Sequence, residues 1–180
     1  MFDILISLFG LIIIGWLIVF LWLFISILSN QRGFFTQKRI GQFGKAFTIY
    51  KLRTIYKDQD SLASRIGKFL RKSKLDEFPQ LFNVLIGDMS FVGPRPDIEG
   101  YYDKLEGEER KILELKPGLT SDASLKYFNE ERLLAKQQDP LGYNDTVIFP
   151  DKVRMNLYYY YHRSFCLDVR ILFNTIFKKY

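Results

Sequence analysis

Cysteine and histidine, on which many disulfide-bonded proteins, metal sites and catalytic sites depend, are scarce in this sequence. Its 180 residues include one cysteine, Cys166, and one histidine, His162. A single cysteine excludes an internal disulfide and a cysteine-rich zinc site. A single histidine leaves Ser-His-Asp catalysis with one candidate base, and His162 follows a run of four tyrosines, where we expect a structural role. No internal repeat or low-complexity tract is found.

Charge is present, but it is unevenly distributed. The chain has a net charge of +6, and residues 31–74 hold twelve Lys or Arg against two Asp or Glu. A basic block of this kind beside an apolar segment indicates a membrane surface with anionic lipids, or substrates that bear phosphate. Nucleic acid is the other interpretation. Because the block contains no DNA- or RNA-binding motif, we expect no nucleic-acid partner.

The longest uncharged stretch runs for 25 residues, from Ile4 to Leu28. As a helix rising ~1.5 Å per residue it would be about 37 Å long, enough to cross a hydrocarbon core of ~30 Å. No basic residue precedes it and no small-residue cleavage site follows it, so it is not typical of a secretory signal. The length therefore predicts a membrane-embedded helix over residues 1–30 and one domain over residues 31–180.

Residues 34–54 predict a small β-hairpin. Apolar and polar residues alternate around Phe47 and Ile49, and two glycines mark a turn at residues 41–45. Lys51 stands near the exit of the second strand. Its side chain belongs either to a solvated strand face or to a phosphate-binding site.

Residues 61–74 predict a basic amphipathic helix, with Leu62, Ile66, Phe69 and Leu70 on one face. This pattern is typical of a helix in the membrane interface, and also of one packed on its own domain. Residues 165–176 predict another amphipathic helix, and the four tyrosines at residues 158–161 before it are typical either of the membrane–water boundary or of packing within the domain. Residues 97–115 predict an acidic, helix-prone surface. The fold class is therefore mixed α/β and mostly helical, with interfacial amphipathic helices around a compact cytoplasmic domain.

Residues 73–96 carry the candidate chemistry. The acidic pair Asp76 and Glu77 directly follows the basic segment, and Pro79 fits the first turn of a helix that begins there, with Asp76 or Ser73 as its cap. Two adjacent carboxylates can share a magnesium ion. One of them can also act as a nucleophile on phosphorus. The pair is therefore the candidate catalytic and metal site.

Two arginines are candidates for binding phosphate. Arg95 stands between Pro94 and Pro96, which stiffen its backbone. A guanidinium on a rigid loop suits bidentate recognition of phosphate, although a structural ion pair is the alternative. Arg71 precedes the acidic pair by one to two helical turns, close enough to reach a substrate pyrophosphate.

These motifs resemble the bacterial sugar transferase family, the small monotopic phosphoglycosyl transferases. The resemblance is carried above all by LDEFPQLFNV at residues 75–84 and GDMSFVGPRP at residues 87–96. Further similar stretches are FDILISL, GFFTQKRIGQFGKAFTIYKLRT, KPGLT and VRMNLYYYYHRSFCLDVRILFNT. They follow the family order over nearly the whole chain.

The resemblance implies transfer of a sugar-1-phosphate from a UDP-sugar to polyprenyl (undecaprenyl) phosphate, the first membrane step of a bacterial glycan pathway such as exopolysaccharide synthesis. It implies that Asp76 attacks the sugar-bearing phosphorus and forms a covalent phosphosugar intermediate. Asp76 and Glu77 would hold Mg²⁺, with proton transfer as the alternative role of Glu77, while Lys51, Arg71 and Arg95 would bind phosphates. The expected partners are the two substrates and membrane lipids. The sugar stays open, as does the oligomeric state, with a homodimer as one alternative.

The resemblance also implies that the apolar helix is re-entrant and returns Asp3 to the side of the basic block. In the spanning alternative, the basic flank fixes the domain in the cytoplasm with the N-terminus outside. The domain faces the cytoplasm, at the bacterial plasma membrane, in both arrangements. Two rival functions stay open: one-step transfer without a covalent intermediate, and a membrane-anchored interaction protein without catalysis. The second rests on departures from the family pattern at Gly15-Trp16 and Phe128.

Overall fold

The computed structural model describes residues 2–177 and forms two compact units. The first unit contains residues 2–39 and 46–89, and the second contains residues 40–45 and 90–177. The elements in chain order are α1 (Phe2–Ser29), β1 (Phe34–Ile40), η1 (Gln42–Gly44), β2 (Ala46–Leu52), α2 (Leu62–Lys72), η2 (Leu75–Glu77), α3 (Gln80–Ile86), β3 (Ser90–Val92), η3 (Tyr102–Lys104), η4 (Glu109–Glu114), β4 (Gly118–Thr120), α4 (Asp122–Lys126), α5 (Glu130–Leu134), α6 (Pro140–Tyr143), η5 (Asn144–Ile148), α7 (Phe149–His162) and α8 (Phe165–Phe177).

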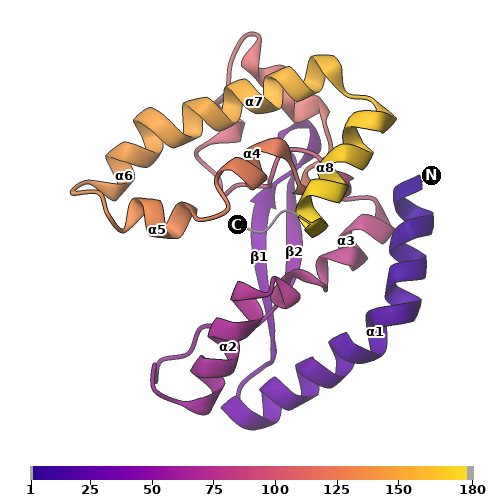
Figure 1. Ribbon diagram of the computed structural model, residues 1–180, viewed down its shortest axis with the longest axis vertical. Helices are drawn as coiled ribbons and strands as arrows, with labels where there is room; N and C mark the ends of the chain where they lie inside the picture. Colours follow the sequence, from indigo (N-terminus) through magenta and orange to yellow (C-terminus); the bar gives the residue numbers. More distant parts are fainter. Residues whose placement is uncertain (1, 178–180) are drawn as a thin grey trace. The chain divides into compact units, whose positions relative to one another are not determined.

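The predicted fold class is confirmed, because helices predominate (Figure 1) and the strands form two small two-stranded sheets. Strands β1 and β2 form the predicted hairpin. A second, parallel pair joins β3 to β4, with Ser90 opposite Gly118 and Val92 opposite Thr120. The sequence does not predict this pair, because strands of three residues are too short to show an alternation of apolar and polar residues.

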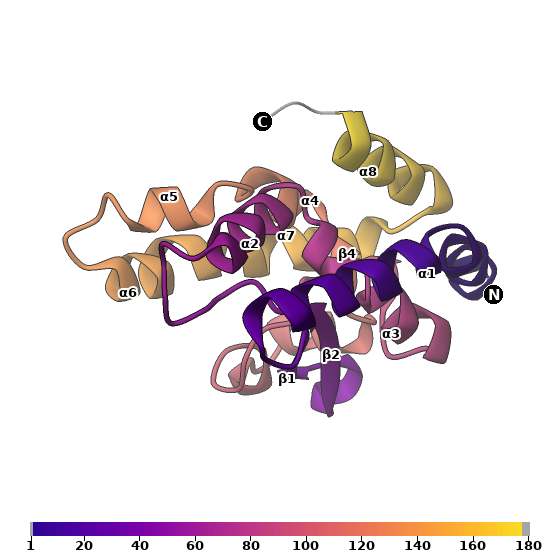
Figure 2. The ribbon, with the colours of Figure 1, turned by 90° about the horizontal axis from the view of Figure 1, so that it is seen from below.

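Helix α1 is continuous from Phe2 to Ser29, and its axis bends. Figure 2 looks almost along its first part, while its second part runs across the view. The helix ends where Asn30 adopts the left-handed conformation, at φ 50°, as is common one residue beyond a helix. Among residues 2–177, α1 is the one helix long and apolar enough to cross a membrane, and most of its side chains are exposed.

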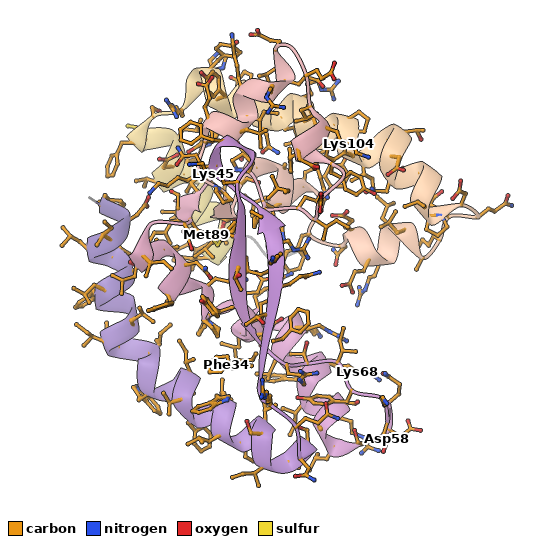
Figure 3. All side chains as sticks on the ribbon, turned by 180° about the vertical axis from the view of Figure 1, so that it is seen from behind. Phe34, Lys45, Asp58, Lys68, Met89 and Lys104 are labelled. Atoms are coloured by element: carbon orange, nitrogen blue, oxygen red, sulfur yellow. The ribbon has the colours of Figure 1, made fainter. Side chains whose placement is uncertain are left out.

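Both parts of α1 pack on other elements of the first unit. In the first part, Gly10 lies beside Leu81 of α3. In the second part, Ile25 joins a core with Leu52 of β2 and Leu70 of α2. Phe34, labelled in Figure 3 at the start of β1, stacks on Trp22 with 5.3 Å between ring centroids. The apolar helix is therefore part of the core of this unit.

Helix α2 forms as predicted, but only part of its predicted apolar face is buried: Leu70 and Ile66 contact the core. Ser61 caps its first turn by accepting a hydrogen bond from the Ser64 amide. The buried residues are Ala63, Ser64, Gly67 and Leu70. Of the predicted apolar face, Leu62 and Phe69 are exposed. The reason is a close approach: a Cβ on Gly67 would lie 2.2 Å from the Thr54 carbonyl oxygen, so small residues must face the neighbouring chain.

The second unit has two apolar cores. One contains Ile40 from the hairpin tip with residues of η3, η4 and α7, and the other lies beneath β3, β4 and α8. The first consists of Ile40, Tyr102, Leu105, Ile112, Leu113 and Val153, and the second of Val92, Leu115, Leu125, Tyr159 and Ile171. The prediction that residues 97–115 form an acidic, helix-prone surface holds for the exposed residues 106–110 but is wrong for the apolar residues of this stretch. They form two 3₁₀ turns whose apolar side chains are core, because their spacing fits three residues per turn.

Candidate active site

The acidic pair lies in η2, a single 3₁₀ turn between α2 and α3. Asp76 is 6% exposed. Glu77 accepts a hydrogen bond from the Lys51 ammonium, with 3.0 Å between Nζ and Oε1. Both side chains of this ion pair are mostly buried, so solvent screens their attraction less than at the surface. The fold thus brings together three of the five predicted site residues, from β2 and from η2.

The predicted capping of this turn is wrong. Ser73 ends α2, and its hydroxyl donates to the carbonyls of Phe69 and Leu70. Lys74 then takes the left-handed conformation at φ 59°, which costs a non-glycine residue roughly 1–2 kcal/mol. This turn in the chain directs Asp76 into the interior, where it cannot cap a helix.

Burial governs the electrostatics of Asp76. Desolvation raises the pKa of its carboxyl group above the ordinary value, and the neighbouring charge of Glu77 raises it further. Lys51 and Lys74 act in the opposite direction. Among residues 2–177, no group donates a hydrogen bond to Asp76 Oδ1. A desolvated carboxylate with an unpartnered oxygen has the surroundings expected of a nucleophile or a ligand for a cation.

Asn83, on α3, fixes the position of the strand that carries Lys51. Its side chain is completely buried, and its amide donates to the Thr48 carbonyl at 2.7 Å. Its Oδ1 accepts a hydrogen bond from the Tyr50 amide at 3.2 Å. Asn83 therefore pairs with the open edge of β2 as another strand would, one residue before Lys51. Asn83 was not among the predicted site residues, although a polar residue within an apolar helical run is a usable signal in the sequence.

Arg71 lies in the last turn of α2, five residues before Asp76, and is partly exposed. Its side chain makes no hydrogen bond or ion pair with the residues that the structure describes. Elements α2 and η2 are in contact. The guanidinium therefore stands in the same unit as the acidic pair with its donors available to a ligand.

Arg95 belongs to the second unit, in the loop that follows β3. Gly93 and Gly118 lie face to face beneath this loop, and a Cβ on Gly118 would be 2.2 Å from the Gly93 nitrogen. The Gly118 amide donates to the Pro94 carbonyl at 2.9 Å. The KPGLT and GPRP motifs are therefore packed together. Arg95 and its two prolines line a small pocket with Tyr102 and Leu115.

The metal-binding capacity of the described residues is limited. Within residues 2–177, no cluster of three or more His, Cys, Asp or Glu side chains could hold a metal ion. This excludes an all-protein cage in that part of the chain. Magnesium commonly uses one or two carboxylates and completes its shell with water and substrate phosphates. The unpartnered oxygen of Asp76 beside Glu77 fits this mode of binding.

The family of this chain follows from comparison of its sequence with those of known proteins. The bacterial sugar transferase family matches residues 1–180, which is the whole chain. The chain belongs to this family. The prediction made from the LDEFPQLFNV and GDMSFVGPRP motifs is confirmed, and so is the prediction that the protein is a transferase enzyme.

Three relatives indicate the range of this sugar transferase family. The uncharacterized sugar transferase EpsL of Bacillus subtilis (strain 168) is 31% identical over 99% of this chain and 85% of its own length. The exopolysaccharide production protein PSS of Rhizobium leguminosarum bv. phaseoli is 32% identical over 97% of this chain and 91% of its own. The UDP-glucose:undecaprenyl-phosphate glucose-1-phosphate transferase of Klebsiella pneumoniae is 32% identical over 98% of this chain but only 38% of its own.

The contacts of His162 agree with the predicted structural role of this residue. His162 stacks on Tyr158 with 4.0 Å between ring centroids, and its Nδ1 lies 2.9 Å from the Tyr158 carbonyl oxygen. The exposed apolar helix α1 and the family membership together indicate membrane association.

Proposed function

We propose that this sugar transferase moves a sugar-1-phosphate from a UDP-sugar to undecaprenyl phosphate, with release of UMP. The Klebsiella relative carries this type of reaction in its name. One substrate of such a reaction is a membrane lipid, which suits an enzyme with an exposed apolar helix. Both substrates are anionic, which suits the basic block that includes Lys51 and Arg71.

In the first step, a lone pair on Asp76 Oδ1 attacks the phosphorus that bears the sugar. A new P–O bond forms to Asp76, the P–O bond to UMP breaks, and UMP leaves with the electron pair. The buried setting of Asp76 supports this role, because a poorly solvated carboxylate is a stronger nucleophile than one in water. Lys51 holds Glu77 and lowers the repulsion between the carboxylates and the incoming phosphate.

In the second step, a phosphate oxygen of undecaprenyl phosphate attacks the same phosphorus. The bond to Asp76 breaks and the carboxylate is restored, while the phosphosugar is left on the lipid. Positioning and neutralisation of charge dominate phosphoryl transfer. Arg71, with its donors available, is proposed to bind phosphate beside the acidic pair, and Arg95 is proposed to bind phosphate on its stiff loop in the second unit.

Asp76 and Glu77 would hold magnesium. When bound, the ion would neutralise negative charge on the transferred phosphoryl group. The unpartnered oxygen of Asp76 supports this assignment. A chelator is therefore expected to stop UMP release, and added Mg²⁺ to restore it.

We further propose that α1 is re-entrant and that the catalytic residues face the cytoplasm. The first part of α1 packs on α3 and the second part on α2 and the hairpin, all within one unit. A straight span would carry the first part away from α3. The bend in α1 (Figure 2) supports a helix that enters and leaves on the same side.

The observation that carries the proposal is the buried carboxylate of Asp76, whose Oδ1 has no hydrogen-bond partner among residues 2–177. Replacement of Asp76 by Asn should abolish UMP release, a barrier increase on the order of several kcal/mol, while the protein stays folded and membrane-bound. Asp60→Asn, at an exposed carboxylate, should retain full activity. The assay combines purified protein, a panel of UDP-sugars and undecaprenyl phosphate. Wild-type turnover by Asp76→Asn would contradict the proposal.

The covalent step is tested by exchange without the lipid acceptor. If Asp76 carries the phosphosugar, labelled UMP enters UDP-sugar in the absence of undecaprenyl phosphate, because the first step is reversible. A one-step transfer through a ternary complex gives no such exchange.

A further inference from the structure

The segment from η2 to α3 has an unusual buried face. It is helical throughout, since the Phe78 amide donates to the Leu75 carbonyl and the Leu81 amide donates to the Phe78 carbonyl. Three polar residues, Asp76, Gln80 and Asn83, are nevertheless buried along it, with 6%, 3% and 0% of their surface exposed. Their spacing of four and three residues places them on one side of the segment. Buried polar side chains are normally hydrogen-bonded.

Two of these side chains depart from that rule, and the third obeys it. Asn83 uses both ends of its amide on the edge of β2. In contrast, Gln80 Nε2 and Asp76 Oδ1 are both buried without a hydrogen-bond partner among residues 2–177. A buried donor without a partner is destabilising. The Gln80 side chain therefore lowers the stability of the free protein. A bound ligand that accepts a hydrogen bond from Nε2 would remove this unfavourable contribution.

The chemistry of the two unpartnered atoms is complementary. Asp76 offers a negatively charged oxygen, whereas Gln80 offers N–H groups. An amide nitrogen does not ligate Mg²⁺, so a metal at the acidic pair would leave the Gln80 donor unused. A phosphoryl group satisfies both residues, because its phosphorus accepts the nucleophile while its nonbridging oxygens accept hydrogen bonds.

We infer that Gln80 is a substrate-binding residue whose amide donates a hydrogen bond to a nonbridging oxygen of the phosphoryl group that Asp76 receives. This inference rests on the proposed function. Negative charge builds on these oxygens as the phosphoryl group is transferred, so the hydrogen bond strengthens in the transition state and acts mainly on kcat. It adds no charge to a site that already contains two carboxylates.

Three variants test the inference. Gln80→Leu removes the donor and keeps much of the volume, and should lower kcat roughly 10- to 100-fold. Its melting temperature should equal or exceed that of the wild type, because an unpartnered buried donor is gone. Asn83→Leu is the matched control, and it should lower the melting temperature, because it breaks two hydrogen bonds that are made. Gln80→Glu keeps the shape but presents a carboxylate to the phosphate, and should be at least as slow as Gln80→Leu.

The measurements are thermal unfolding and steady-state UMP release with the UDP-sugar that the wild type turns over best. A kcat for Gln80→Leu close to that of the wild type would overturn the inference and leave the proposed function standing. A melting temperature lowered as much as in Asn83→Leu would also overturn it, since Gln80 would then be structural. If the wild type releases no UMP from any UDP-sugar, the proposed function fails and takes this inference with it.

Discussion

At the residue scale, burial and hydrogen bonding distinguish the candidate catalytic carboxylate from the other acidic residues. The chain has twenty Asp and Glu residues, and Asp76 stands apart from the exposed ones because it is desolvated and one of its oxygens has no partner among residues 2–177. Its pKa is raised by burial first and by Glu77 second. The cost of burying such a group is accepted in proteins mainly where the group has a function.

The Lys51–Glu77 ion pair should act as one unit in catalysis. Lys51→Met and Glu77→Gln should each lower the rate of UMP release by roughly 10- to 100-fold, because each leaves a mostly buried charge without this partner. The double variant should lose far less than the product of the two single effects. Lys68→Met, at an exposed lysine, is the control. Multiplicative losses would show that the two residues act independently.

At the element scale, close backbone contact decides how α2 is placed. Gly67→Ala should destabilise the protein strongly, because the added Cβ would lie 2.2 Å from the Thr54 carbonyl oxygen and the helix must shift. Gly15→Ala is the matched control in another helix. Apart from its chain neighbours and its own helix backbone, no atom of residues 2–177 lies within 4 Å of the added Cβ, and alanine favours a helix over glycine by about 1 kcal/mol. Denaturant unfolding in detergent should separate the two variants by several kcal/mol.

The outer face of α2 should contact the membrane. Phe69 is 64% exposed and stands among basic residues, whereas Leu70 next to it is 2% exposed. Phe69→Ser should leave the melting temperature unchanged and weaken the turnover of undecaprenyl phosphate in vesicles, because an interfacial anchor is lost. Leu70→Ser should lower the melting temperature, as expected for a core residue.

If Phe69→Ser instead destabilises the protein in detergent as much as Leu70→Ser does, this face packs on protein and the interfacial assignment is wrong. Equal turnover by the wild type and by Phe69→Ser in vesicles would contradict it as well.

At the scale of the whole molecule, the re-entrant form of α1 can be tested with one reactive thiol. Because Cys166 is the only cysteine, Cys166→Ser gives a background without thiols, and Phe2→Cys then marks the start of the chain. We expect no labelling by a membrane-impermeant maleimide in intact cells and full labelling after permeabilisation. Labelling of intact cells would place residue 2 outside and establish a spanning helix.

The division of the chain at residue 30, with a membrane-embedded part before it and a cytoplasmic domain after it, stays a prediction that this labelling also addresses. The compact units of the structure are divided differently. The apolar helix shares a core with β2 and α2, so membrane embedding and packing within the first unit involve the same element.

The sequence by itself determined the family, the hairpin, the long apolar helix and the identity of the acidic pair. These features depend on local patterns, such as alternation, an uncharged run and a motif of adjacent residues, and local patterns can be recognised without three-dimensional contacts. The fold class followed because most of the chain has helical periodicity.

Only the tertiary structure decided which side chains contact one another and which are buried. The close approach of Gly67 to Thr54 shifts the buried face of α2, so that Leu70 is buried while Leu62 and Phe69 of the same apolar pattern are exposed. The sequence marks Asn83 as a polar residue in an apolar run, but only the structure shows that its hydrogen-bond partners are Thr48 and Tyr50 of β2. Whether Asp76 and Gln80 have hydrogen-bond partners depends on every atom around them, and these atoms come from segments distant in the chain. Burial and hydrogen bonding are properties of the folded surroundings, which is why no local pattern could supply them.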